Sequence, residues 1–127
     1  MSEGIAEKEL TRVLERLVLL WQQLEGMINS QLSGLPEWEK VNRDHGFTYG
    51  VKRSRDEIST GQGLTPVISV RFRLVRSGED DPTPLMPRSV RIYFGPHGPI
   101  YKFGEHAFAP EIVARLAAIY IANGLNG

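Results

Sequence analysis

Three histidines, His45, His97 and His106, are the first side chains in this sequence to consider for chemistry. Imidazole binds zinc and transfers protons near neutral pH. No two of the three have the i, i+4 spacing that places two imidazoles on one helix face, and the chain has no cysteine. The spacing therefore predicts neither a metal site nor a cofactor. An enzyme or ligand site near His97 and His106 is kept as the third of three functional alternatives.

His97 lies within residues 92–106, which read IYFGPHGPIYKFGEH. Two strand-like runs flank the Gly-Pro-His-Gly-Pro segment. Pro96 presets φ for a turn and Gly98 tolerates positive φ, so we predict a tight turn with His97 at an exposed tip. The chain has no Gly-x-Ser-x-Gly motif, P-loop or dinucleotide-binding fingerprint. We therefore name no catalytic residue and expect a protein that is not an enzyme.

A basic surface is the more informative feature. Residues 43–102 hold ten Lys or Arg and six Asp or Glu, and we expect those acids at or outside the strand ends. The alternation of side chains along a strand places four of these cations and one tyrosine on one face of a sheet: Lys52, Arg71, Arg73, Arg91 and Tyr93. Cations among aromatic rings can bind single-stranded nucleic acid. They can equally be a solvated face or a protein contact. The chain balances 15 basic against 15 acidic residues, which favours the second interpretation.

The strands that would carry this face follow a period of two. Residues 47–52, 67–76 and 89–94 alternate apolar and polar side chains, as antiparallel strands with one covered face do. Turn-forming residues dominate 54–66 and 77–87, so we predict long connectors in both places. Residues 100–103 could add a fourth strand.

Helices are predicted at both ends. Leu10, Leu17 and Leu24 repeat every seven residues within 5–33, and the Gly34 and Pro36 that follow end this helix. Pro36 can begin one more short helical turn. A second helix begins near Pro110 and is apolar on most sides, so it should be largely buried.

The first helix carries a stripe wider than one neighbour normally covers. One row of this stripe consists of Leu14, Trp21 and Ile28. A second copy of the chain could cover that row through a symmetric contact. We therefore predict a homodimer with these three residues at its interface, although packing within one chain would satisfy them as well.

Together these patterns predict one α+β domain over residues 1–127. It has a long N-terminal helix, a three- or four-stranded antiparallel sheet and a C-terminal helix, with both helices on one face. The acidic N-terminus and the shortness of every apolar run favour a soluble, cytoplasmic protein with no membrane partner. We expect a small binding, adaptor or chaperone-like protein that holds a protein or peptide. Single-stranded nucleic-acid binding through the basic face is the alternative.

Overall fold

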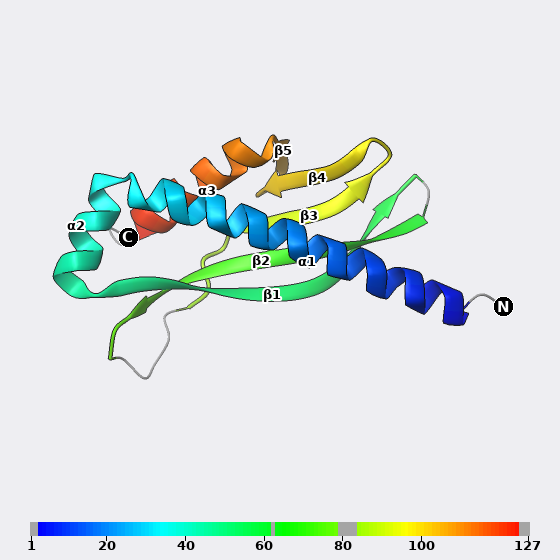
Figure 1. The fold of residues 1–127 in the computed structure, drawn as a ribbon, viewed down its shortest axis with the longest axis horizontal. Coiled ribbons are helices and arrows are strands. Elements are labelled where there is room, and N and C mark those ends of the chain that lie inside the picture. Colours follow the sequence, from blue (N-terminus) through cyan, green and yellow to red (C-terminus); the bar gives the residue numbers. More distant parts are fainter. Residues whose placement is uncertain (1–2, 62, 79–83, 125–127) are drawn as a thin grey trace.

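A computed structural model describes residues 3–61, 63–78 and 84–124 of the chain. It contains three helices and five strands (Figure 1). The elements are α1 (Glu3–Ser33), α2 (Pro36–His45), β1 (Phe47–Thr60), β2 (Gly63–Arg76), β3 (Ser89–Gly95), β4 (Gly98–Phe103), β5 (His106–Phe108) and α3 (Pro110–Asn123). The α+β class and the terminal helices are therefore as the sequence predicts.

The helices begin and end at the predicted signals. α1 ends at Ser33, before Gly34, and Pro36 occupies the first turn of α2, where its missing N–H costs nothing. α2 is longer than the short turn we expected. It ends at His45, and the following Gly46 adopts the left-handed conformation with φ 66°. α3 begins at Pro110, also a first-turn proline.

The strands form one antiparallel sheet in the order β1-β2-β3-β4-β5. The predicted long connector at 54–66 is wrong, because β1 and β2 pair over their full lengths, from Phe47 opposite Arg76 to Thr60 opposite Gly63. Polar and charged residues continue this ladder because backbone hydrogen bonds, not side-chain burial, carry it. β5 is a fifth strand beyond the predicted three or four. It has three residues, too few to show an alternation.

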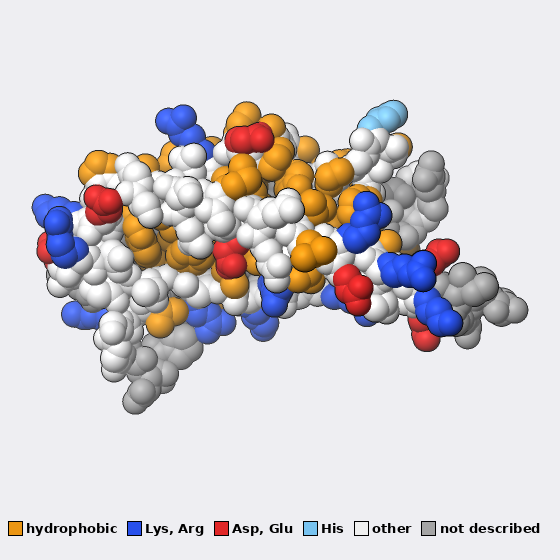
Figure 2. Space-filling view, in the orientation of Figure 1, with side chains coloured by type: hydrophobic (Ala, Val, Ile, Leu, Met, Phe, Trp, Pro, Cys, Tyr) orange, Lys and Arg blue, Asp and Glu red, His pale blue; other side chains and the backbone are white. Residues whose placement is uncertain are grey.

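Both terminal helices cover the same face of this sheet, as predicted, and α1 crosses the strands diagonally (Figure 1). The alternate β2 residues Ile68, Val70, Phe72 and Leu74 are buried in the core with α1 and α3. The ring of Trp21 on α1 lies 6.2 Å from that of Phe72. On this side of the molecule, hydrophobic side chains gather in the middle of the view, where α1 and α3 lie, and charged side chains lie mainly towards the two ends (Figure 2). This helix-covered face therefore holds the hydrophobic core.

The turn between β3 and β4 is also as predicted. Pro96 and His97 form its tip, Gly95 pairs with Gly98, and Gly98 has φ 126°, which L side chains rarely adopt. Within the described parts of the chain, no helix combines the length and the apolar character that a membrane span requires.

Candidate functional site

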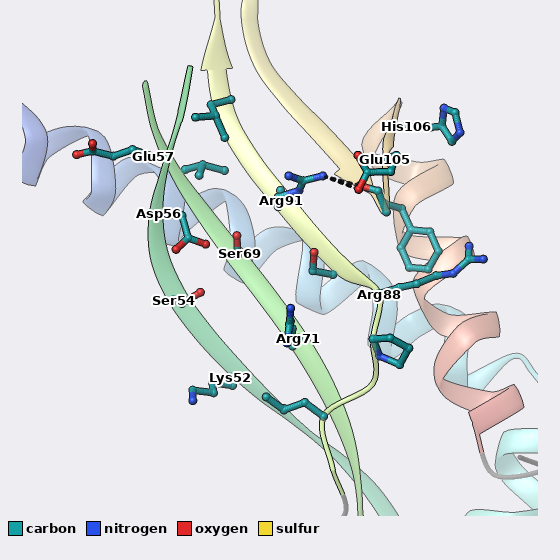
Figure 3. Close-up of a pocket in the computed structure, with 17 residues that line it drawn as sticks. Lys52, Ser54, Asp56, Glu57, Ser69, Arg71, Arg88, Arg91, Glu105 and His106 are labelled. Carbon is teal, nitrogen blue, oxygen red and sulfur yellow. Dashed lines mark hydrogen bonds and ion pairs between the residues drawn. The ribbon is translucent and has the colours of Figure 1, made fainter. Parts of the chain in front are cut away.

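A cavity of about 930 Å³ lies on the reverse face of the sheet, the face that α1 and α3 do not cover (Figure 3). β2 pairs with β3 only from Ile68 to Arg71, so the longer β1–β2 hairpin projects beyond β3 at both ends. The natural twist of such a ribbon turns it out of the plane of the remaining strands. β1, β2 and β3 provide the floor, and the 85–88 segment and the turn between β4 and β5 border it. A cavity of this size is typical of ligand sites.

The floor carries two cations placed directly opposite one another. Lys52 on β1 pairs in register with Arg71 on β2, and both side chains line the cavity. Like charges at opposed positions destabilise a sheet. Among the described residues, neither Lys52 nor Arg71 has an ion-pair partner. The pair therefore forms a place where a bound anion would be stabilised.

Arg91 on β3 supplies a third cation, and its guanidinium is held in place by the neighbouring turn. Its Nη2 donates a hydrogen bond of 2.9 Å to the carbonyl oxygen of Gly104. That turn is in turn fixed to the start of β3, because the Gly104 N–H donates to the Ser89 carbonyl at 3.0 Å. Arg91 Nε, by contrast, is the one buried side-chain nitrogen or oxygen without a hydrogen-bond partner in the described part of the chain.

Acidic side chains also reach the cavity, contrary to prediction. Asp56 and Glu57 lie within β1, not at a strand end, because β1 continues to Thr60. Glu105 lies in the β4–β5 turn, and its Oε1 is 3.7 Å from Arg91 Nη2, which is beyond hydrogen-bond length (Figure 3). The cavity is therefore a mixed site in which the cations occupy the floor and acids occupy parts of the wall.

The five residues predicted for the basic face divide into two groups. Lys52, Arg71 and Arg91 line the cavity. Arg73 and Tyr93 have the parity of the same face but do not line it. Arg73 lies opposite Gly50, and its Cγ is 3.4 Å from the point where a Cβ on that glycine would stand. The aliphatic part of the Arg73 side chain therefore covers the backbone of Gly50, outside the cavity.

The histidines do not converge where the structure describes them. His97 is exposed at the β3–β4 turn, and His106 is exposed at the start of β5. β4 separates the two, a span of about 20 Å at the usual rise of a strand. His106 points away from the cavity centre (Figure 3). No group of three His, Asp or Glu suited to a metal ion occurs among the described residues, and the His45 side chain lies outside the description.

The residues predicted for a dimer interface lie mostly inside the chain. Trp21 and Ile28 are 1% and 0% exposed, because the sheet and α3 together cover the wide stripe of α1. They are therefore not available to a second copy. Leu14 is partly buried and packs against the same core, at the edge of a shallow apolar groove with Val18 and Leu19.

The sequence interpretation missed several cavity residues. Ser54 and Ser69 lie opposite one another on the floor, and Pro87 and Arg88 bring the loop before β3 to its edge. The loop is held there by the Met86 N–H, which donates to the Phe72 carbonyl at 2.7 Å. Alternation through Lys52, Ser54 and Asp56 would have signalled the β1 residues if the strand had been extended past Ser54.

Comparison with known proteins adds no relative: no protein-family model, no curated protein and no solved structure matches this chain. The site must therefore be interpreted from its own geometry.

Proposed function

We propose that this chain is a non-enzymatic binding module that holds an acidic segment of a peptide or protein in the cavity on the reverse face of its sheet. The observation that carries the proposal is the placement of Lys52 directly opposite Arg71 on the cavity floor. Such a pair costs stability in the free protein, and a carboxylate between the two cations removes the repulsion.

The surroundings of the two cations favour a peptide as the ligand. Ser54 and Ser69 add hydroxyl groups that can donate to or accept from a peptide backbone, and Ile58 and Leu85, which are partly exposed, add apolar contact. The volume of the cavity, about 930 Å³, suits a short extended segment, since ligand sites of this size combine an apolar lining with a few directed polar groups.

Single-stranded nucleic acid is the alternative ligand, and its binding would require different side chains on the same face. Bases would need exposed aromatic rings beside the cations. Tyr93, the aromatic residue predicted for that role, does not line the cavity, and Phe103, which does, is 7% exposed and packs against Tyr120 on the helix side. This arrangement favours the peptide.

The test is a titration of ¹⁵N-labelled protein, followed by NMR, with the blocked peptide acetyl-Ser-Glu-Ala-Gln-Ser-amide. We expect saturable shifts at the amides around Lys52, Ser69 and Arg71. The Arg71→Ala substitution should weaken binding about tenfold, the value of one charge-assisted hydrogen bond. The Arg73→Ala variant is the matched control, because it removes the same charge from the same strand face outside the cavity.

Two results would overturn the proposal. One is the absence of saturable shifts in low salt. The other is an equal loss of affinity in the Arg71→Ala and Arg73→Ala variants, because a delocalised basic surface would then account for binding. A parallel titration with a short oligothymidine distinguishes peptide binding from the binding of single-stranded nucleic acid. Binding that Tyr93→Ala and Arg73→Ala both weaken would favour the nucleic-acid platform.

A further inference from the structure

Arg91 has hydrogen-bonding capacity that the folded chain does not use. Its Nε is buried and without a partner among the described residues, although the side chain as a whole is 25% exposed and lines the cavity. A buried donor without a partner lowers the stability of the folded protein. Because the Gly104 carbonyl fixes Nη2, the guanidinium already has a set orientation and offers its remaining donors to an incoming oxyanion.

Glu105 occupies the place of that oxyanion only loosely. Its carboxylate stands 3.7 Å from Arg91 Nη2, too far for a hydrogen bond, and the Glu105 side chain is 88% exposed (Figure 3). An ion pair with one largely solvated member contributes little to stability. A ligand carboxylate that reaches the exposed part of the Arg91 guanidinium can therefore displace Glu105 at small cost.

The strand register places Arg91 at a defined spacing from Arg71, one of the two cations of the first anion site. Ser69 lies opposite Arg91 and Arg71 lies opposite Ser89, so Arg71 and Arg91 are diagonal neighbours on adjacent strands. Diagonal neighbours on one face are about 7–8 Å apart. An extended peptide presents residues i and i+2 on the same side with a nearly equal spacing of about 6.6 Å, two steps of strand rise.

We infer that the partner is an extended segment with two acidic residues at i and i+2. The first carboxylate lies on Arg71, beside Lys52, and the second lies on Arg91, where it displaces Glu105. Glu105 thereby competes with the second ligand carboxylate for Arg91, and so weakens the binding of that carboxylate. This inference rests on the proposed function, because it specifies the ligand of the same cavity.

Three blocked peptides with the same termini test the spacing. Acetyl-Ser-Glu-Ala-Glu-Ser-amide carries acids at i and i+2, acetyl-Ser-Glu-Glu-Ala-Ser-amide carries the same charge at adjacent positions, and acetyl-Ser-Glu-Ala-Gln-Ser-amide carries one acid. Adjacent residues of an extended peptide point to opposite sides, so the second peptide can use only one of the two sites at a time. We expect the alternating peptide to bind about threefold to tenfold more tightly than either of the others.

The Glu105→Gln substitution tests the competitor. It should tighten binding of the alternating peptide about threefold and leave the single-acid peptide nearly unchanged. Glu37→Gln, on the exposed surface of α2, is the control for net charge and should change neither. Since Glu105 is exposed, its substitution leaves the core intact.

Equal affinities for the alternating and adjacent peptides would overturn the inference, and so would a Glu105→Gln variant that tightens binding of all three peptides alike. Either result is compatible with continued binding of the single-acid peptide, which would leave the proposed function standing. Loss of binding by all three peptides would instead remove the proposed function itself.

Discussion

The two faces of β2 show how differently one strand can be used. On the helix-covered side, Val70 and Phe72 are fully buried against α1 and α3. On the reverse side, Arg71 is exposed beside Lys52, and the Nε of Arg91 on the neighbouring strand has no partner in the described part of the chain. The first face lowers the free energy of the folded chain, and the second raises it locally. A face whose unpaired charges lower the stability of the fold is a candidate for ligand binding.

The largest expected effect concerns the core. Trp21→Ala should lower the free energy of unfolding by about 3–5 kcal/mol, because it removes a buried ring that packs against Phe72. Chemical denaturation followed by circular dichroism measures the change. Arg71→Ala is the comparison on the reverse face and should leave the stability nearly unchanged. A large loss in Arg71→Ala would show that the reverse face also stabilises the fold.

A smaller effect concerns the polar group at the edge of the helix-covered face. The Tyr49 hydroxyl donates a hydrogen bond to Asn29 Oδ1. Burial, and secondly the negative charge of Glu25, raises the pKa of Tyr49 from 10.0 to about 12. Tyr49→Phe should cost about 1 kcal/mol at neutral pH, the usual value of such a bond.

The raised pKa of Tyr49 also makes that contribution depend on pH. The unfolded chain releases the phenolic proton near pH 10 and the folded chain retains it to about pH 12, so the unfolded state binds fewer protons in this range. The contribution of Tyr49 to stability is therefore full below pH 10 and is lost as the pH rises towards 12. Denaturation of the wild type and the Tyr49→Phe variant across this range should show their difference shrinking. A constant difference would contradict the shift.

The smallest expected effect tests directly whether the charges of the reverse face lower the stability of the fold. Lys52→Gln should raise the free energy of unfolding by about 0.5 kcal/mol, because it removes the like charge opposite Arg71. The gain should diminish as added salt screens the repulsion. The same variant should bind the acidic peptide more weakly. Arg55→Gln, which removes an exposed cation of β1 that does not line the cavity, serves as the control. A destabilised Lys52→Gln variant would show that the pair is not repulsive.

Much of the architecture follows from patterns along the chain. Apolar residues every three or four positions, ended by Gly34 and Pro36, predict α1 correctly. The alternation through Ile68, Val70 and Phe72 correctly identifies the covered side of β2. These features are local, since they depend on helical and strand periods and on the dihedral preferences of glycine and proline. The limit of such patterns appears in the β1–β2 hairpin, where charged residues conceal a ladder that backbone hydrogen bonds sustain.

The sequence by itself therefore determined the two terminal helices, the covered face of the strands and the cations of the reverse face. The tertiary structure alone decided which of those charges share a cavity. Register separates Arg71 from Arg73, and the β3–β4 hairpin brings Glu105 to Arg91 from outside any local pattern. It also decided that Trp21 belongs to the core, because the sheet and α3 together cover the whole stripe of α1. The physical reason is the same in each case: periodicity orients a side chain, but only the packing of distant segments determines what it meets.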